Sequence, residues 1–151
     1  MRHAAILAMA MLAANIAAGA NAAATDVLVT NDPLRHPYQI TANSGTCQFQ
    51  GDCAIVFSSV TWTRVVVTHV SCAFSLANTG AVNNAILGST TTGAENELPA
   101  VQFANQGSLS VFGINQDTYI FFGKGEAPRL DVYSLNEPVQ NLHCTLSGYT
   151  T

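Results

Sequence analysis

Basic side chains are scarce in this chain. Its 151 residues include five Lys and Arg residues against nine Asp and Glu residues, and the formal net charge is −4 at pH 7. Proteins that bind nucleic acid or anionic membranes generally do so through clusters of Lys and Arg. No such cluster occurs along this sequence, so we predict neither nucleic acid nor an anionic membrane surface as a partner.

The motifs of common catalytic and metal sites are lacking as well. The sequence contains no G-x-S-x-G, no H-E-x-x-H, no phosphate-binding glycine loop, and no C-x2-C or H-x3-H pair. We therefore predict no cofactor and no metal site, we name no catalytic residue, and we favour a non-catalytic protein.

The first 24 residues have the layout of a secretory signal peptide. A short basic start precedes an apolar run that ends near Ala14, and small residues then form A-x-A patterns ending at Ala22 and Ala24. The run is too short and too rich in Ala for a membrane-spanning helix, which needs about 20 apolar residues. We predict cleavage after Ala22 or Ala24, export to the periplasm or the extracellular medium, no transmembrane span after cleavage, and one mature domain over residues 25–151.

A sustained helical period is absent from the mature part. Short runs rich in Val, Ile, Phe, Tyr and Thr are instead separated by turn residues every 8 to 12 positions or so, which is typical of an all-β fold. We predict a single antiparallel β-sandwich, jelly-roll-like or immunoglobulin-like, stapled by disulfides. Connections are expected at residues 31–45, 78–84, 93–99 and 115–117, and strands at residues 26–30, 53–60, 64–77, 85–92, 100–107, 108–114, 118–123, 129–135 and 141–149.

Four cysteines lie in the mature part, and an oxidising compartment would pair them as two disulfides. Cys47 and Cys53 lie on either side of a Gly-Asp turn, which favours a local bridge between them. Cys72 and Cys144 would then form the second bridge across most of the domain. Spacing alone allows three connectivities, so this pairing is a preference drawn from the strand pattern.

Strand alternation also assigns these residues to faces. Along residues 64–77 one apolar set is formed by the even positions, namely Val66, Val70, Cys72, Phe74 and Leu76. We therefore expect Cys72 and Cys144 to point inward, and His69 and His143 to point outward. His143 then cannot serve as a base for its neighbour Cys144. The two histidines would share a face if the disulfide joins neighbouring strands, and would lie on opposite surfaces if it joins facing sheets.

Two places carry aromatic side chains that could bind a ligand. Trp62 is the single tryptophan, and we expect it to cap one end of the core, with stacking on a ligand as the alternative. Tyr119, Asp131 and Tyr133 form a second candidate group, because residues 129, 131 and 133 would share the polar face of a strand. An ordinary solvated sheet surface is the competing interpretation there.

The sequence thus favours an exported, non-catalytic β-sandwich that binds a glycan or an envelope protein. One alternative is a pilus-type or other surface-assembly subunit, in which residues 26–30 could be donated as a strand to a neighbour. A second alternative is a small exported hydrolase that uses carboxylates near Asp117 and Asp131.

Overall fold

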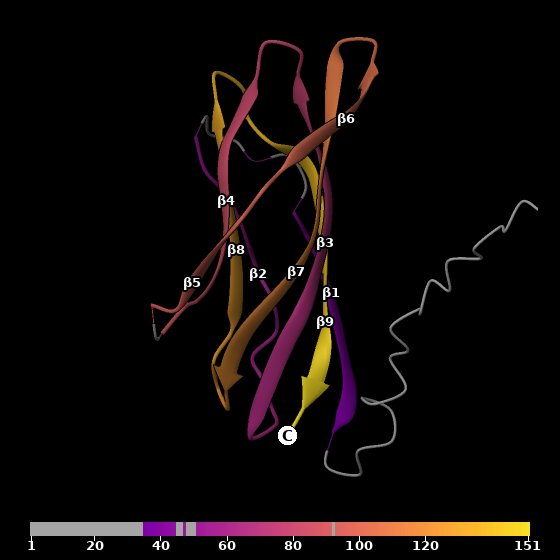
Figure 1. Cartoon of the computed structure of the whole chain (residues 1–151). Coiled ribbons are helices and arrows are strands. Elements are labelled where there is room, and N and C mark those ends of the chain that lie inside the picture. The colour runs from indigo at the N-terminus through magenta and orange to yellow at the C-terminus, as the bar shows by residue number, and fades with distance from the viewer. Residues whose placement is uncertain (1–34, 45–46, 48–50, 92) are drawn as a thin grey trace, which may run out of the picture.

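Alternating apolar and polar residues fold this chain into two packed antiparallel sheets (Figure 1). The computed structural model describes residues 35–44, 47, 51–91 and 93–151. These residues contain no helix and form nine strands: β1 His36–Ser44, β2 Cys53–Val56, β3 Arg64–Ala77, β4 Ala81–Ser89, β5 Glu95–Leu98, β6 Val101–Gln106, β7 Leu109–Gly123, β8 Pro128–Leu135 and β9 Gln140–Thr150.

The two sheets divide the strands unequally. Sheet A has the order β1-β9-β3-β7-β6, and sheet B has the order β2-β8-β4-β5. Strands β5 and β6 follow one another in the chain with only Pro99 and Ala100 between them, yet they belong to different sheets. The chain therefore crosses from one sheet to the other along one side of the sandwich, as the diagonal run from β6 to β5 in Figure 1 shows. The predicted β-sandwich is confirmed.

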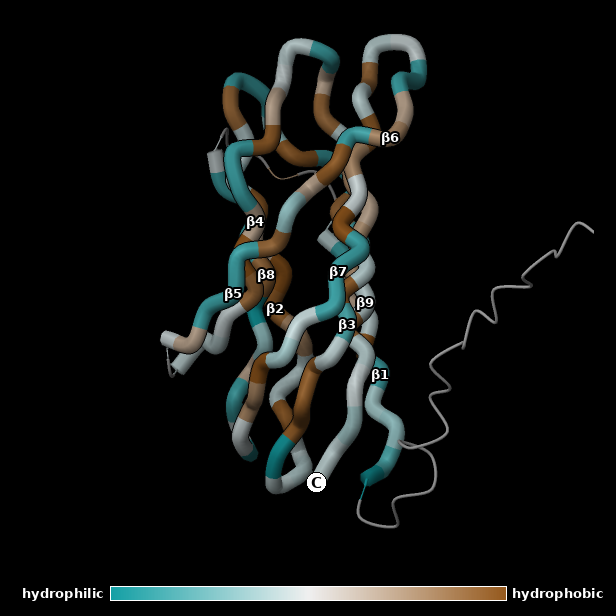
Figure 2. Tube along the Cα trace, viewed as in Figure 1, coloured by the Kyte–Doolittle hydropathy of each residue, from teal (hydrophilic) through white to brown (hydrophobic). Residues whose placement is uncertain are grey.

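The core lies between the sheets and follows the alternation of the strands (Figure 2). On β8, Leu130 and Val132 are completely buried while the residues between them are partly exposed, and Leu142, Cys144 and Leu146 repeat the pattern on β9. Complete burial of one such aliphatic side chain contributes about 1.5–3 kcal/mol relative to exposure. The same alternation leaves every second residue of these strands on an outer surface.

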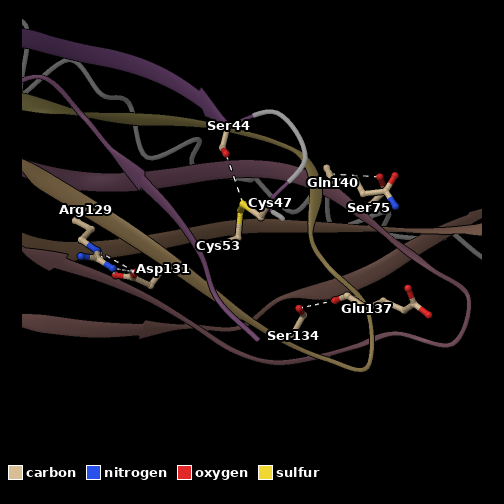
Figure 3. Close-up of a disulfide and its surroundings, with 9 residues drawn as sticks. All are labelled: Ser44, Cys47, Cys53, Ser75, Arg129, Asp131, Ser134, Glu137 and Gln140. Carbon is tan, nitrogen blue, oxygen red and sulfur yellow. Dashed lines mark hydrogen bonds and ion pairs between the residues drawn. A yellow bond between two sulfur atoms is a disulfide. The ribbon is translucent and has the colours of Figure 1, made fainter. Parts of the chain in front are cut away.

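Both predicted disulfides are present. Cys47 is bonded to Cys53 at the start of β2, next to the end of β1 (Figure 3), and Cys72 is bonded to Cys144. Cys72 and Cys144 occupy directly paired positions on β3 and β9, so this bridge joins neighbouring strands of one sheet. Of the two arrangements left open by the sequence, the structure has the one in which the histidines share a face.

His69 and His143 nevertheless do not form a pair. His69 lies opposite Ser147 on β9, and His143 lies opposite Ala73 on β3. The two histidines are therefore displaced by four residues along the strands, which corresponds to about 13 Å. Among the residues that the structure describes, no group of three His, Cys, Asp or Glu side chains is arranged to hold a metal ion.

Four expected connections were wrong in part. Residues 81–84 begin β4. The other three are polar segments. Residues 36–44 form β1, which pairs along its whole length with β9, and residues 95–98 form β5. Residues 115–117 continue β7, which pairs with β3 through this polar stretch. All three segments are polar because they lie at sheet edges or on an outer surface, and polar composition alone does not distinguish such strands from loops. The predicted signal peptide and the expected strand at residues 26–30 both lie outside the described residues.

A bulge in β3 changes the face that its first residues present. The register with both β7 and β9 shifts between Val67 and His69. Val65 and Val67 therefore join the core with Val70, whereas Val66 is buried on the other face, opposite Phe121 and Tyr149. The assignment of Val66 to the inward set was wrong because an extra residue reverses the alternation on one side of a bulge.

The part of the chain that the structure describes has no helix with the length and apolar character needed to cross a bilayer.

Candidate functional site

Three aromatic side chains meet on the outer face of sheet A, near the end of β9 and the C-terminus marked in Figure 1. Tyr119 and Phe121 are alternate residues of β7 and contact each other edge to face, with ring centroids 5.0 Å apart. The hydroxyl of Tyr119 lies 3.1 Å from that of Tyr149 on β9. Tyr119 is 60% exposed and Phe121 is 44% exposed, whereas Tyr149 is 5% exposed. Two of the three rings are thus held open to solvent by a rigid sheet.

Two arginines lie over these rings. The guanidinium carbon of Arg35 is 4.5 Å from the centroid of Tyr149, and that of Arg64 is 5.1 Å from the centroid of Phe121. Both distances are within the range in which a cation is attracted to the face of an aromatic ring. We call these five residues (Arg35, Arg64, Tyr119, Phe121 and Tyr149) the aromatic surface.

Trp62 lies at the same end of the sandwich. It precedes Arg64 by two residues, and its ring stacks on that of His36, with centroids 6.2 Å apart and planes inclined by 29°. His36 in turn follows Arg35. Trp62 is 53% exposed, so the expectation that it caps the core was wrong. The core is closed there without it, because Val60 and Val65 are buried on either side of this loop.

Short polar side chains continue the outer face of sheet A beyond the aromatic surface. His69 Nδ1 lies 2.8 Å from the Asp117 carboxylate, and the hydroxyls of Thr41 and Thr145 lie 3.0 Å apart. Ser71 occupies the next outward position of β3. The result is a flat sheet surface with hydrogen-bonding groups at one end and exposed rings at the other.

The far edge of the same face is more apolar. A shallow hollow of about 330 Å³ lies between β6, β7 and β3 and is lined in part by Val101, Phe103 and Gly113. Val101 and Phe103 are 64% and 63% exposed. The Phe103 ring lies so close to Gly113 that a Cβ atom there would be 3.0 Å from it.

Asp131 and Tyr133 lie on the opposite outer face, in sheet B. The guanidinium of Arg129 donates to both oxygens of Asp131, at 2.6–2.9 Å (Figure 3). This hydrogen bonding and the charge of Asp131 raise the pKa of Arg129, and the same negative charge raises the pKa of Tyr133. Together with Glu95 these residues line a hollow of about 260 Å³.

The structure therefore separates residues that the sequence had placed in one group. Tyr119 belongs to sheet A, whereas Asp131 and Tyr133 belong to sheet B, with the core between them. Asp117 and Asp131 are likewise on different outer faces. The backbones of two packed sheets lie about 10 Å apart, and these two side chains point away from each other on either side. These two carboxylates cannot flank one substrate bond, so they give no support to the hydrolase hypothesis.

No protein family, curated protein or solved structure matches this chain.

Sequence reasoning identified Tyr119 and Trp62 but missed the residues around them. The exposure of Phe121 could not be recognised from the sequence, because residues 119–122 are all apolar and suggest a strand that is covered on both faces. Arg64 and Tyr149 lie 55 and 30 residues from Tyr119 in the sequence, and only the pairing of β3 with β7 and β9 brings them together. No motif or spacing in a single sequence signals that arrangement.

Proposed function

We propose that this protein is an exported, non-catalytic β-sandwich that binds a glycan on the outer face of sheet A. The observation that carries the proposal is the exposed pair Tyr119 and Phe121, fixed edge to face on one strand with the Tyr119 hydroxyl held by Tyr149. Aromatic rings with a polar tip suit ligands that are apolar on one side and hydrated on the other. The apolar face of a sugar ring is a surface of that kind.

The surroundings of the rings favour a glycan over a protein partner. A protein interface generally has an apolar centre that is depleted of charged residues. Here the rings are continued by hydroxyl, amide and imidazole groups, including Thr145, Ser71 and His69, on a flat sheet. Such groups donate and accept hydrogen bonds with sugar hydroxyls. The two disulfides are compatible with a place of action outside the cytoplasm.

The test is a binding screen of the mature protein against neutral and acidic polysaccharides, followed by calorimetric titration with the best ligand. Tyr119→Ala and Phe121→Ala are each expected to weaken binding about tenfold, because each removes a stacking surface worth roughly 1.5 kcal/mol. Tyr133→Ala, which truncates a tyrosine on the opposite sheet, is the matched control and should bind normally. Loss of affinity in the control alone, or binding to proteins and to no glycan, would contradict the proposal.

A further inference from the structure

The charges on the described residues are distributed unevenly over the two outer faces. Of the four cations in this part of the chain, Arg35, Arg64 and Lys124 lie at the end of sheet A that carries the aromatic surface. Arg64 pairs with Gly123 across β3 and β7, and Lys124 is the next residue of the turn. Glu95 and Glu97 belong to sheet B. A chain that is acidic as a whole therefore has a cationic end.

Arg64 and Arg129 differ in what their guanidinium groups contact. The donors of Arg129 are directed to both oxygens of Asp131. Arg64 makes no ion pair with any residue that the structure describes, and its guanidinium lies over the face of Phe121. A planar guanidinium that rests on a ring keeps its N–H groups at its rim, where they can meet a carboxylate side by side. The guanidinium of Arg129 already binds a carboxylate in this way, whereas that of Arg64 binds none among the described residues.

The acidic side chains near this end, Glu126 and Asp117, form no ion pair with Arg64. The carboxylate of Glu126 accepts hydrogen bonds from the backbone of Gly123 and from Thr91. Asp117 is paired with His69 and lies four residues from Phe121 along β7, a distance of about 13 Å. Attraction for a negatively charged ligand is thus concentrated where the exposed rings are.

We propose that the aromatic surface recognises an acidic polysaccharide, in which Arg64 binds a sugar carboxylate while Tyr119 and Phe121 contact the ring that carries it. This inference rests on the proposed glycan-binding function and specifies its ligand as a polymer of uronic acid. Stacking alone does not distinguish neutral from acidic sugars. A guanidinium beside the rings does, because its parallel N–H groups can bond both oxygens of a carboxylate, a group that a neutral sugar lacks.

The experiment compares oligogalacturonate with the same oligosaccharide after its carboxyl groups have been reduced to hydroxymethyl groups. Each is titrated calorimetrically into the mature protein at about 0.1 M and about 1 M NaCl, between which the screening length falls from about 10 Å to about 3 Å. We expect the acidic form to bind at least about tenfold more tightly at low salt, as a charge-assisted bidentate contact implies. Most of that difference should disappear at high salt.

Two arginine variants locate the effect. Arg64→Gln is expected to remove the preference for the acidic form, so that the two oligosaccharides bind with similar affinity. Arg129→Gln has the same net charge but alters the opposite sheet, and it should keep the preference. Circular dichroism and thermal unfolding of both variants verify that they are folded, and Arg64→Lys, which retains the charge without the planar fork, should recover only part of the preference.

The outcomes separate this inference from the proposed function. Equal binding of the two oligosaccharides, with no effect of Arg64→Gln, would refute the acidic ligand and leave glycan binding intact. Failure of both forms and of a panel of neutral glycans would refute the proposed function and this inference with it. Binding to phosphatidylglycerol vesicles that depends on Arg64, without binding to any glycan, would also overturn it by assigning the cationic end to a lipid surface.

Discussion

The side chain of Tyr38 places a polar group in an apolar environment. It lies on β1 with its side chain against the core, and its hydroxyl is buried without a hydrogen-bond partner among the described residues. Burial raises the pKa of Tyr38, because an ionised phenolate is poorly solvated there. The buried hydroxyl thus opposes folding, whereas the ring of the same side chain favours it.

Tyr38→Phe is accordingly expected to stabilise the protein by up to about 1 kcal/mol, since an unsatisfied buried polar group costs about 1–3 kcal/mol and the ring is kept. Urea unfolding monitored by circular dichroism measures the change. Tyr119→Phe is the control, because it removes the hydroxyl of an exposed tyrosine, and that hydroxyl has a partner in Tyr149. It should give no stabilisation. A lower urea midpoint for Tyr38→Phe would mean that its hydroxyl makes a favourable contact.

The raised pKa of Tyr38 also gives that comparison a pH dependence. Below pH 10 Tyr38 is protonated in both the folded and the unfolded state, so its titration does not change the free energy of unfolding. As the pH rises from 10 through the folded pKa, the unfolded state releases the proton first, and the free energy of unfolding of the wild type falls. The stability advantage of Tyr38→Phe over the wild type should therefore grow above pH 10. An advantage that is independent of pH would contradict the cause given for the shift.

At the scale of strands, the bulge in β3 depends on a glycine in its neighbour. Gly148 on β9 pairs with Val67, and a Cβ atom added to it would overlap the carbonyl oxygen of Val66 and lie 3.0 Å from the Cα of Val67. Those atoms belong to backbone and cannot move aside without breaking the pairing. The close approach of the two strands at the bulge is possible because residue 148 has no side chain.

We expect Gly148→Ala to destabilise the protein by about 1–3 kcal/mol or more, as overpacking against a fixed backbone does. The control is Gly123→Ala, because the nearest atoms to its added Cβ would be the flexible Glu126 carboxylate at 3.6 Å. Thermal unfolding of the two variants gives the comparison. Equal midpoints would show that β9 can shift relative to β3 at little cost.

The sequence predicted most of the strands that are half buried and fewer of those that are polar. Alternation placed β3, β8 and β9 correctly, and with them the inward cysteines. It failed for β1 and β5, which are edge strands with few apolar residues, and for the middle of β7, where Asn115 and Asp117 face solvent. It also failed at Val66, because a one-residue bulge has no signature in apolar alternation.

For the candidate site, the sequence could indicate single aromatic residues but not their neighbours. Strand pairings between β3, β7 and β9 decide which rings meet, and these pairings join residues far apart in the chain. Exposure was equally hidden, as Trp62 shows, because a large aromatic side chain is more often buried than open.

For the whole molecule, the two disulfides differ mainly in the length of chain that they close. Cys47 and Cys53 are 6 residues apart, and Cys72 and Cys144 are 72 residues apart. In the chain-entropy model the short loop contributes about 2 kcal/mol and the long loop about 4 kcal/mol. The long-range bridge is thus expected to provide the larger share of the covalent stabilisation.

Replacement of both cysteines of a pair by Ala tests this difference with equal loss of side-chain atoms. One double variant combines Cys72→Ala with Cys144→Ala, and the other combines Cys47→Ala with Cys53→Ala. Urea unfolding should show that the free energy of unfolding falls about twice as much in the first as in the second. Similar losses in the two double variants would indicate that local packing around the sulfurs, rather than loop length, determines their contribution.

The position of β9 in sheet A has a consequence for when the protein can fold. This last strand is inserted between β1 and β3 and supplies the partner of Cys72. Until residues 140–150 have been synthesised, β1 and β3 both lack the strand with which they pair. Sheet A therefore cannot be completed until β9 has been synthesised, whereas all four strands of sheet B precede it. The strand order thus makes the closing of sheet A, and with it the Cys72–Cys144 bridge, depend on β9.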